Sequence, residues 1–388
     1  MRDKALKKIM LSELEIFGYK TFVRPYAFQF SDPEDSHLQM MSWAAKIDNS
    51  PFLKFLMRKF FCYEDKGLEA TIGNLHIKNP VGLAGGFDKD GKFASILPYV
   101  GFGFFEVGTI TQKAWPRRAR PRIKRFPDYE SAANWMGFPG EGVDAIIPRI
   151  ANYNGNVPLL ANFGATADVV ASDVDAAIGA YVECYRKLKP YAKYFVVNKS
   201  SPNTTGLRQL SLSGILEALE HEDENLMANL WIKIAPDSSA PEKTIYQELD
   251  ELIEMHSRFN YSGLIAANTT IDNNLRDMLG MRDSEGNFIG GASGDVALFK
   301  TMPIIRYLHR NAPHIPKIAV GGIKNPGIAI DYIKSGASAL EVMTPLFYQG
   351  PALPRFLNEG IANYMKKEGV RNYTELIGTS VSPNKTMV

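Results

Sequence analysis

A (β/α)8 barrel with a small helical extension at its N-terminal side is the fold that this sequence predicts. Eight short apolar runs recur along the chain, with helical segments between them. Strand and helix alternating over about 290 residues is the pattern of such a barrel, in which active sites lie at the carboxyl ends of the strands. The expected strands are residues 81–84, 104–107, 158–162, 194–198, 230–234, 263–267, 317–320 and 339–342.

A doubly wound sheet would use the same alternation of strand and helix. Such a sheet usually carries a G-x-G-x-x-G motif after its first strand, and no such motif follows the first strand here. A doubly wound sheet also collects its functional residues at one switch point, whereas polar residues follow several different strands of this chain. The barrel is therefore the favoured architecture.

The composition favours small-molecule chemistry. The chain has 44 basic and 42 acidic side chains, and it contains no basic run interleaved with aromatic residues, so nucleic acid is not an expected partner. Its two cysteines, Cys62 and Cys184, have no metal-ligand spacing. Neither a disulfide framework nor a bound metal is expected, and a reducing cytosol fits this cysteine usage.

Residues 1–66 are expected to form short helices rather than the start of the barrel. Asp32-Pro33 and Ser50-Pro51 each combine an N-cap residue with proline at the first helical position. The helix expected over residues 52–61 has a broad apolar surface that is interrupted by lysine and arginine. This helix either packs on the barrel or lies against a membrane surface.

The two ends of the chain carry further expectations. The apolar residues after Met1 are broken by charges, and no run of about 18 apolar residues occurs. Neither a secretory signal nor a transmembrane helix is therefore expected. The last segment, residues 370–388, is expected to be a frayed tail.

Residues 67–369 are expected to form the barrel domain. Alternating apolar residues around Gly73-Asn74 predict a short hairpin that leads into the first barrel strand. Two connections, residues 110–157 and 270–292, are longer than a barrel needs. They are expected to be functional insertions that lie over its mouth.

The loop at residues 198–208 is the main candidate for chemistry, because polar side chains follow directly on an apolar strand there. Pro202 and Gly206 prevent helix and sheet from continuing. Four polar side chains can therefore converge on one small volume: Asn198, Ser201, Asn203 and Thr204. From this segment alone, a turn that caps the next helix is an equal alternative.

Lys233 lies inside the apolar fifth strand, where an ammonium group is costly unless it faces an anion or an electron-rich partner. Three roles of Lys233 remain open: Schiff-base formation, contact with an anion or a flavin, and a structural salt bridge. Gly321-Gly322 and Thr344 follow the last two strands, where barrels hold a phosphate. These strand ends favour a phosphate-bearing ligand with a large planar ring.

With these motifs, the chain from about residue 19 to residue 369 resembles the class 2 dihydroorotate dehydrogenases, an FMN-dependent, quinone-reducing and membrane-associated family. The matching segments are N-P-V-G-L-A-G-G-F-D-K at 79–89, N-W-M-G-F at 134–138, S-S-P-N-T-T-G-L-R at 200–208, K-I-A-P-D at 233–237, N-T-T at 268–270, G-G-A-S-G at 290–294 and V-G-G-I at 320–323.

The resemblance implies a role for each matching residue. Ser201 would be the base that takes the proton from C5 of the substrate while hydride passes from C6 to flavin N5. Thr204 and Phe138 would form the proton path. Substrate binding is implied for Lys89, Asn134, Trp135, Met136, Gly137, Phe138, Asn198, Asn203, Asn268 and Thr269. FMN binding is implied for Gly85, Gly86, Gly108, Thr109, Asn162, Asn198, Lys233, Ser293, Gly294, Gly321, Gly322, Met343 and Thr344.

The implied reaction is the oxidation of dihydroorotate to orotate, a step of de novo pyrimidine biosynthesis, with the electrons passed to a membrane quinone. The similar class 1 enzymes place a cysteine as base, and no cysteine lies in the loop here. Residues 1–66 would form the tunnel by which quinone reaches the flavin, with His37 and Arg125 as its polar residues. Peripheral contact with the cytoplasmic face of a membrane is expected.

Two alternatives stay open. One is a class 1-like enzyme that uses fumarate or NAD, and the other is a barrel that binds FMN or a phosphate ligand without turnover. The chain also departs from the family pattern at Gly85, where alanine is more usual, at Lys199, which replaces an aliphatic residue, and at Met343, where tyrosine is frequent. Lys199 is expected to point away from the site by strand alternation. The residue at position 343 is expected to influence which type of quinone the protein uses.

Overall fold

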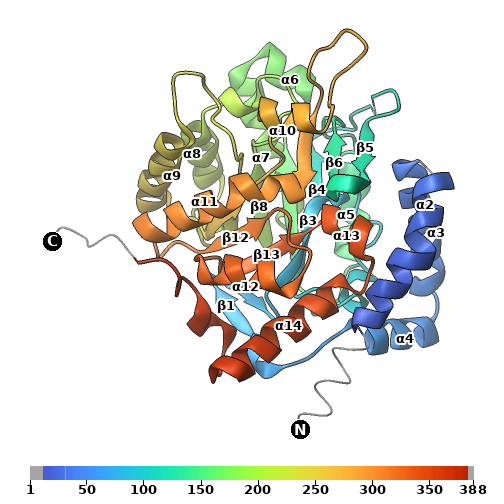
Figure 1. Cartoon of the computed structure of the whole chain (residues 1–388). Helices are drawn as coiled ribbons and strands as arrows, with labels where there is room; N and C mark the ends of the chain where they lie inside the picture. Colours follow the sequence, from blue (N-terminus) through green and yellow to red (C-terminus); the bar gives the residue numbers. More distant parts are fainter. Residues whose placement is uncertain (1–11, 31, 117, 383–388) are drawn as a thin grey trace.

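Eight parallel strands close into a barrel at the centre of the molecule, in the spatial order β10-β12-β13-β3-β4-β7-β8-β9. This arrangement is seen in a computed structural model that describes residues 12–30, 32–116 and 118–382 (Figure 1). The predicted barrel and all eight of its predicted strands are confirmed. The strands are β3 (Val81–Asp88), β4 (Phe104–Thr111), β7 (Leu159–Gly164), β8 (Tyr194–Asn198), β9 (Leu230–Ile234), β10 (Gly263–Ala266), β12 (Lys317–Val320) and β13 (Ala339–Val342).

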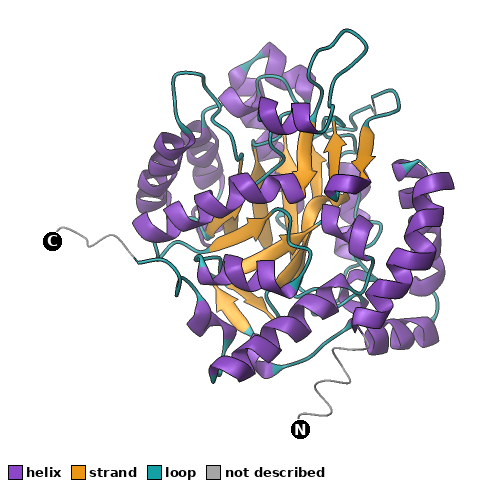
Figure 2. Cartoon of the chain, viewed as in Figure 1, coloured by secondary structure: helices purple, strands orange, loops and turns teal. Residues whose placement is uncertain are grey.

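Helices surround the barrel on its outside (Figure 2). They cover the outer face of the strands, which explains why the sequences of the barrel strands are continuous apolar runs. The helices are α5 (Val143–Ala151), α6 (Ala167–Ser172), α7 (Val174–Leu188), α8 (Leu212–Glu222), α9 (Ile245–Phe259), α10 (Asn273–Met278), α11 (Asp295–Asn311), α12 (Pro326–Lys334), α13 (Thr344–Gln349) and α14 (Leu353–Glu368). Short 3₁₀ helices lie at Lys66–Leu68, Leu97–Tyr99, Pro127–Tyr129, Leu207–Gln209, Glu224–Asn229 and Tyr373–Leu376.

The amino-terminal end of the barrel is closed by apolar side chains. The predicted hairpin is present as β1 (Ala70–Ile72) and β2 (Leu75–Ile77), which pair antiparallel around Gly73. Its buried side chains join those of the barrel interior in one cluster with Ile72, Leu75, Ile77, Phe104, Leu160, Tyr194, Val196, Trp231, Ile265, Ile318 and Ala339. Because this end is filled, a ligand has room only at the carboxyl ends of the strands.

The two long connections form a small sheet that the sequence did not predict. The strands β5 (Ile123–Phe126), β6 (Ser131–Asn134) and β11 (Gly291–Gly294) pair antiparallel, in the order β11-β6-β5. The first two belong to one connection and the third follows the other. In Figure 1, β5 and β6 stand beside the carboxyl ends of β3 and β4. The expected insertions therefore hold each other in place next to the barrel mouth.

The N-terminal helices lie along one side of the barrel, at the right of Figure 1. They are an α-helical stretch at residues 12–18, a π-helix at Tyr19–Val23, α2 (Arg24–Phe30), α3 (Pro33–Asp48) and α4 (Pro51–Phe61). Both predicted helix starts are confirmed, since the Asp32 side chain accepts a hydrogen bond from the backbone N–H of Glu34 at 2.8 Å, and that of Ser50 from Leu53 at 3.3 Å. The predicted helical extension is therefore present, although residues 1–11 lie outside the described residues.

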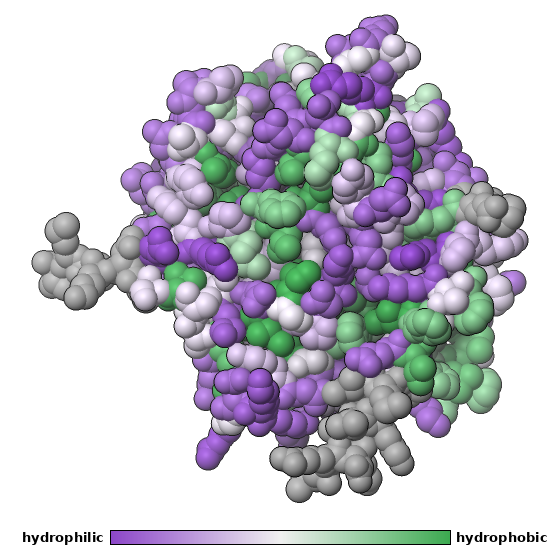
Figure 3. Space-filling model, viewed as in Figure 1, coloured by the Kyte–Doolittle hydropathy of each residue, from purple (hydrophilic) through white to green (hydrophobic). Residues whose placement is uncertain are grey.

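The N-terminal helices expose many large apolar side chains. Figure 3 shows the apolar surface over this part of the molecule at its lower right. The exposed residues include Leu14, Phe17, Phe22, Tyr26, Leu38, Met40, Trp43, Phe52, Leu53, Phe55 and Phe60. None of the helices within the described ranges has both the length and the apolar composition that crossing a bilayer requires.

The expectation of a frayed tail from residue 370 is wrong for residues 370–382. Tyr373 is fully buried, and its hydroxyl donates to the backbone carbonyl of Ser338 at 2.8 Å. The backbone N–H groups of Gly378 and Ser380 donate to carbonyls at the end of α12, at 3.1 and 2.9 Å. These contacts tie the segment to the barrel, and residues 383–388 lie outside the described residues.

Candidate active site

A cavity of about 1180 Å³, measured with its open mouth, lies at the carboxyl ends of the barrel strands. Residues from nearly every barrel strand and from the insertion at residues 110–157 line it, together with Ser293 and Gly294, which follow the second insertion. The sequence-predicted site residues that line it are Gly85, Gly86, Lys89, Thr109, Asn134, Met136, Gly137, Phe138, Asn198, Ser201, Asn203, Lys233, Asn268, Thr269, Ser293, Gly294, Gly321, Gly322, Met343 and Thr344. The structure therefore brings most of the predicted residues to one place.

Four predicted residues do not line the cavity: Gly108, Trp135, Asn162 and Thr204. Asn162 is fully buried, and Gly108 allows strand β4 to approach it, because a Cβ atom at Gly108 would lie 2.1 Å from the carbonyl oxygen of Asn162. The backbone N–H of Trp135 donates to the carbonyl of Arg122 at 2.9 Å. The Thr204 hydroxyl is buried, and no partner for it exists among the described residues.

Side-chain amides at the strand ends form hydrogen bonds in two groups, which together make up an amide network. The Asn198 amide donates to the Thr109 hydroxyl at 2.8 Å, and its oxygen accepts from the Ser200 hydroxyl at 2.8 Å. The Asn268 amide donates to the same Ser200 hydroxyl at 2.9 Å. Asn203, three positions after Ser200, forms a separate pair in which its amide donates to the Asn134 side-chain oxygen at 3.0 Å. These bonds fix the orientation of each amide, so the wall offers a preset pattern of donors and acceptors.

Ser201 stands on this wall with its hydroxyl held by the chain itself. Its side-chain oxygen accepts from the backbone N–H of Asn203 at 3.2 Å, and only 6% of the residue is exposed. Buried Arg208 holds the loop from below, because its guanidinium donates to the carbonyls of Ser200 at 2.9 Å and Thr269 at 3.2 Å. The loop that carries Ser201 is therefore tied to the segment that follows strand β10.

Lys199 points away from the cavity, as expected from strand alternation. Its ammonium group donates to the carbonyl of Arg208 at 2.8 Å, and the residue does not line the cavity. Burial lowers the pKa of Lys199 to about 8. The residue thus supports the loop from its outer side.

The floor of the cavity carries two acidic residues that sequence reasoning missed. Lys233 forms an ion pair with Glu106 at 2.5 Å, and its ammonium group lies 3.8 Å from Glu341. All three side chains are at most 5% exposed, and both Lys233 and Glu341 line the cavity. The sequence contained a signal for both, since Glu106 and Glu341 each interrupt an apolar strand, as Lys233 does. Lys233 therefore has a salt bridge and also faces the ligand site.

Gly85 explains one departure from the family pattern. Its backbone N–H donates to the Glu106 carboxylate at 2.9 Å. A Cβ atom at Gly85 would lie 2.8 Å from the other oxygen of that carboxylate and 3.0 Å from the Asn162 amide. Glycine is thus the residue that leaves room for the Glu106 carboxylate in this orientation.

The opposite side of the cavity fits a phosphate-bearing planar ligand. Gly321 and Gly322 have positive φ angles and present backbone rather than side chains. The Thr344 hydroxyl donates to the Ser293 hydroxyl at 2.8 Å, which places two hydroxyls together beside them. On the side of Ser201, the buried Thr269 hydroxyl also lines the cavity without a partner in the described part of the chain. Glycine backbone and hydroxyls are a donor set that suits a phosphate group.

A second cavity, of about 760 Å³, lies between helix α3 and the first one. His37, Leu38 and Met41 line it from α3, and it shares Gly86, Lys89, Ile123, Met136, Pro139, Met343 and Phe347 with the first cavity. The His37 ring meets the Phe87 ring edge to face at 5.3 Å between centroids. The two cavities therefore adjoin, with Met343 between them.

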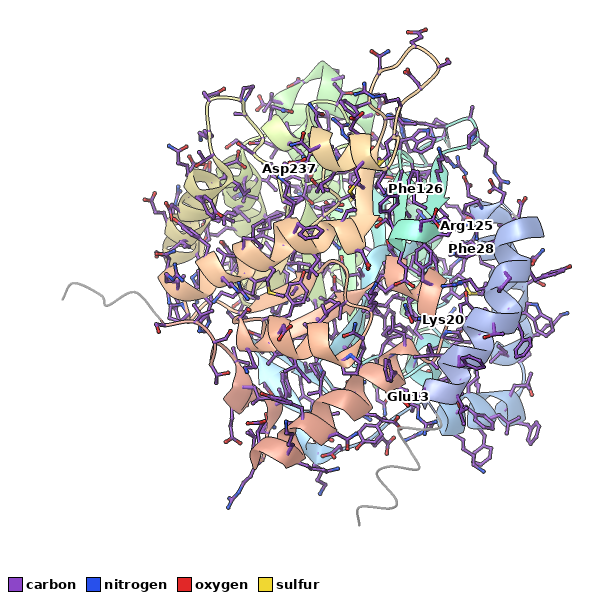
Figure 4. The ribbon with its side chains drawn as sticks, viewed as in Figure 1. Glu13, Lys20, Phe28, Arg125, Phe126 and Asp237 are labelled. Carbon is purple, nitrogen blue, oxygen red and sulfur yellow. The ribbon has the colours of Figure 1, made fainter. Side chains whose placement is uncertain are left out.

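Arg125 is not brought to this cavity. In the described part of the chain it lines neither cavity, and its guanidinium lies over the Phe28 ring at 4.2 Å from the centroid (Figure 4). Burial lowers its pKa. Helix α3 is instead anchored by Arg122, whose guanidinium donates to both carboxylate oxygens of Glu34, one of them at 2.8 Å.

Comparison with known proteins gives consistent matches. The family profile described as dihydroorotate dehydrogenase matches residues 67–365. A dihydroorotate dehydrogenase (quinone) of Trichodesmium erythraeum is 34% identical over 380 residues, covering 93% of this chain and 98% of that protein. One of Christiangramia forsetii is 35% identical over 350 residues, covering 88% and 98%. The crystal structure of DHODH from Eimeria tenella in complex with ferulenol superimposes with a TM-score of 0.75 at 28% identity, covering 91% of this chain and 97% of that one.

Proposed function

This chain belongs to the dihydroorotate dehydrogenase family, and we propose that it oxidises dihydroorotate to orotate and passes the electrons to a quinone. The observation that carries the proposal is the joining of two cavities, one lined by Ser201 and the amide network, the other by helix α3. The relatives named as quinone enzymes also match this chain over the N-terminal helices, because the matches cover up to 95% of it.

FMN is the cofactor that we propose for the larger cavity. When bound, it supplies a ring that accepts hydride from the substrate and later releases electrons. Lys233 would contact the ring from the cavity floor, and Gly85-Gly86 would let the ring lie against backbone. The phosphate would lie at Gly321, Gly322, Ser293, Gly294 and Thr344.

The amide network would hold the substrate. Asn134, Asn198, Asn203 and Asn268 present donors and acceptors in fixed orientation, which matches the ring amides of dihydroorotate. Lys89, whose ammonium group donates to the carbonyl of Gly86 at 2.6 Å, would pair with the substrate carboxylate.

Ser201 is proposed as the base that removes the C5 proton. A hydroxyl is a weak base, so the proton must pass onward, and the buried Thr204 hydroxyl on the same loop is the proposed next group, with Phe138 excluding bulk water. The cysteines do not compete for this role. Burial raises the pKa of Cys62 to about 11 and that of Cys184 further, and neither residue lines the cavity.

The second cavity is proposed as the route of the quinone. His37, Leu38 and Met41 give it an apolar wall with one polar ring, and Met343 separates it from the flavin site. An isoprenoid quinone is apolar along its tail and polar at its ring, so it suits such a wall. Since Arg125 lies outside this cavity, its proposed contact with quinone would require the quinone to extend toward α2.

Peripheral contact of the N-terminal helices with the membrane surface is also proposed, on the cytoplasmic face. Helix α4 exposes Phe52 by 66% and Phe55 by 61%. We expect the double substitution Phe52→Glu/Phe55→Glu to weaken binding to phospholipid vesicles by at least about tenfold. It replaces two aromatic side chains that would lie in the apolar part of the membrane surface. Co-sedimentation with vesicles measures this.

A matched control is Phe299→Glu, because Phe299 is 69% exposed on helix α11, away from the N-terminal helices. The control is expected to bind vesicles like the unchanged protein. Equal binding by the α4 variant and the control would contradict the proposed contact. Reduction of a soluble dye with dihydroorotate should be the same in all three proteins.

Steady-state assays separate the proposed acceptor from fumarate and NAD. Oxidation of dihydroorotate is expected to be fast with a short-chain quinone and slow with fumarate or NAD, since Leu38, Met41 and Met343 give the second cavity an apolar wall. Rapid turnover with fumarate and none with quinone would instead favour the class 1-like alternative.

A further inference from the structure

The cavity floor holds two buried carboxyl groups but only one ammonium group. Glu106 is well satisfied, because it accepts from Lys233 at 2.5 Å, from the backbone N–H of Gly85 at 2.9 Å and from the amide of Asn162. Glu341 lies 3.8 Å from Lys233, which is beyond hydrogen-bond distance. Among the residues that the structure describes, no donor reaches either oxygen of Glu341.

The two carboxyl groups therefore differ in charge. An ionised carboxylate that is fully buried without donors is costly, whereas a carboxylic acid needs only an acceptor for its proton. Two adjacent carboxyl groups also share one proton more readily than both ionise. Burial, and next the charge of Glu106, hold the pKa of Glu341 well above its ordinary value. For Glu106, burial is outweighed by Lys233 and the hydrogen bonds, which lower its pKa.

We propose that Glu341 keeps its proton in the folded protein, donates it in a hydrogen bond to Glu106, and so leaves the cavity floor without net charge. Lys233 contributes one positive charge and Glu106 one negative charge, while Glu341 contributes none. Glu341 is then a positioning residue, which acts on the flavin through Glu106 and Lys233. Only the naming of the ligand as a flavin rests on the proposed function.

The neutral floor has a consequence for electron uptake at this site. A negative charge beneath an electron acceptor in a low-dielectric cavity makes reduction harder, and a neutral Glu341 avoids that charge. Glu341→Gln replaces one neutral group with another of similar shape. We therefore expect this variant to keep the midpoint potential of the bound flavin at neutral pH. If Glu341 were ionised, the same substitution would remove a negative charge and raise the potential, which would overturn the proposal.

Infrared spectra of the full-length protein and its variants test directly whether Glu341 carries the proton. The C=O stretch of a buried carboxylic acid should be present at neutral pH in the unchanged protein and absent in Glu341→Gln. It should also be absent in Glu106→Gln, because Glu341 then gives up its proton and becomes the counter-ion of Lys233. Retention of the band in Glu341→Gln, or its absence from the unchanged protein, would contradict the proposal.

Glu359 supplies a matched control, since it is as deeply buried but is paired with Arg355 at 2.9 Å. Glu359→Gln should keep the carboxylic acid band, and loss of the band there would show that the signal does not come from Glu341. The carboxylic acid band can be measured whether or not dihydroorotate is the substrate. If the protein did not oxidise dihydroorotate, the band would still be expected. If the band were absent, the proposed function would still stand.

Discussion

Ser201→Ala is expected to slow reduction of the bound flavin by dihydroorotate by at least about 100-fold, the lower range for removal of a general base. The amide network does not pass through the Ser201 hydroxyl, which accepts only from the backbone N–H of Asn203. Flavin content and substrate binding are therefore expected to stay close to those of the unchanged protein. Stopped-flow absorbance of the flavin under anaerobic conditions measures the rate.

Ser172→Ala is the control for this variant. Its hydroxyl donates to the carbonyl of Val169 at 3.0 Å on the short helix α6 and does not line the cavity. The control should reduce the flavin at the unchanged rate. Near-normal reduction in Ser201→Ala would remove Ser201 from the role of base and leave it as a binding residue.

Lys233→Met is expected to lower the free energy of unfolding by about 3–5 kcal/mol, the usual cost of breaking a buried ion pair from one side. The Glu106 carboxylate is fully buried and keeps only neutral donors once the ammonium group is removed. Denaturant titration of the purified protein, followed by tryptophan fluorescence, gives the change in unfolding free energy. The double variant Glu106→Gln/Lys233→Met should recover most of this loss.

Lys317→Met is the matched control, because Lys317 is a second buried lysine on a barrel strand. Its ammonium group donates to the carbonyls of Ala312 at 2.6 Å and Pro313 at 3.4 Å, and burial lowers its pKa to about 7. Removing a lysine that neutralises no carboxylate leaves only neutral carbonyl groups without a donor, so the loss should be smaller, about 1–3 kcal/mol at most. Equal losses in both variants would mean that the ion pair is not the reason for the effect.

The barrel strands could be predicted because burial on both faces leaves a continuous apolar run. Residues 194–198 and 230–234 are examples in which the predicted and observed strands coincide. The sheet of β5, β6 and β11 gave no such signal. The strand Ser131–Asn134 and its partner Gly291–Gly294 are short, small and polar, and they pair across a long stretch of sequence. Their pairing is determined by the barrel that brings them together.

The candidate site was predictable in its composition more than in its detail. Ser201 and the asparagines could be found because polar residues end apolar strands, and most of them line one cavity. The burial of Thr204 and the packing of Trp135 outside the cavity depend on loop conformation, which the sequence does not specify. Glu106 and Glu341 could have been found by the reasoning applied to Lys233, since a charge within an apolar strand needs a partner.

The central claim is that one cavity takes electrons from dihydroorotate and the adjoining cavity gives them to a quinone. Anaerobic mixing of the full-length protein with dihydroorotate, followed by a second mixing with quinone, tests both steps in one measurement. Flavin absorbance should be lost in the first step and return in the second with quinone, but not with fumarate or NAD. Flavin that stays oxidised with dihydroorotate, or that quinone does not reoxidise, would contradict this claim.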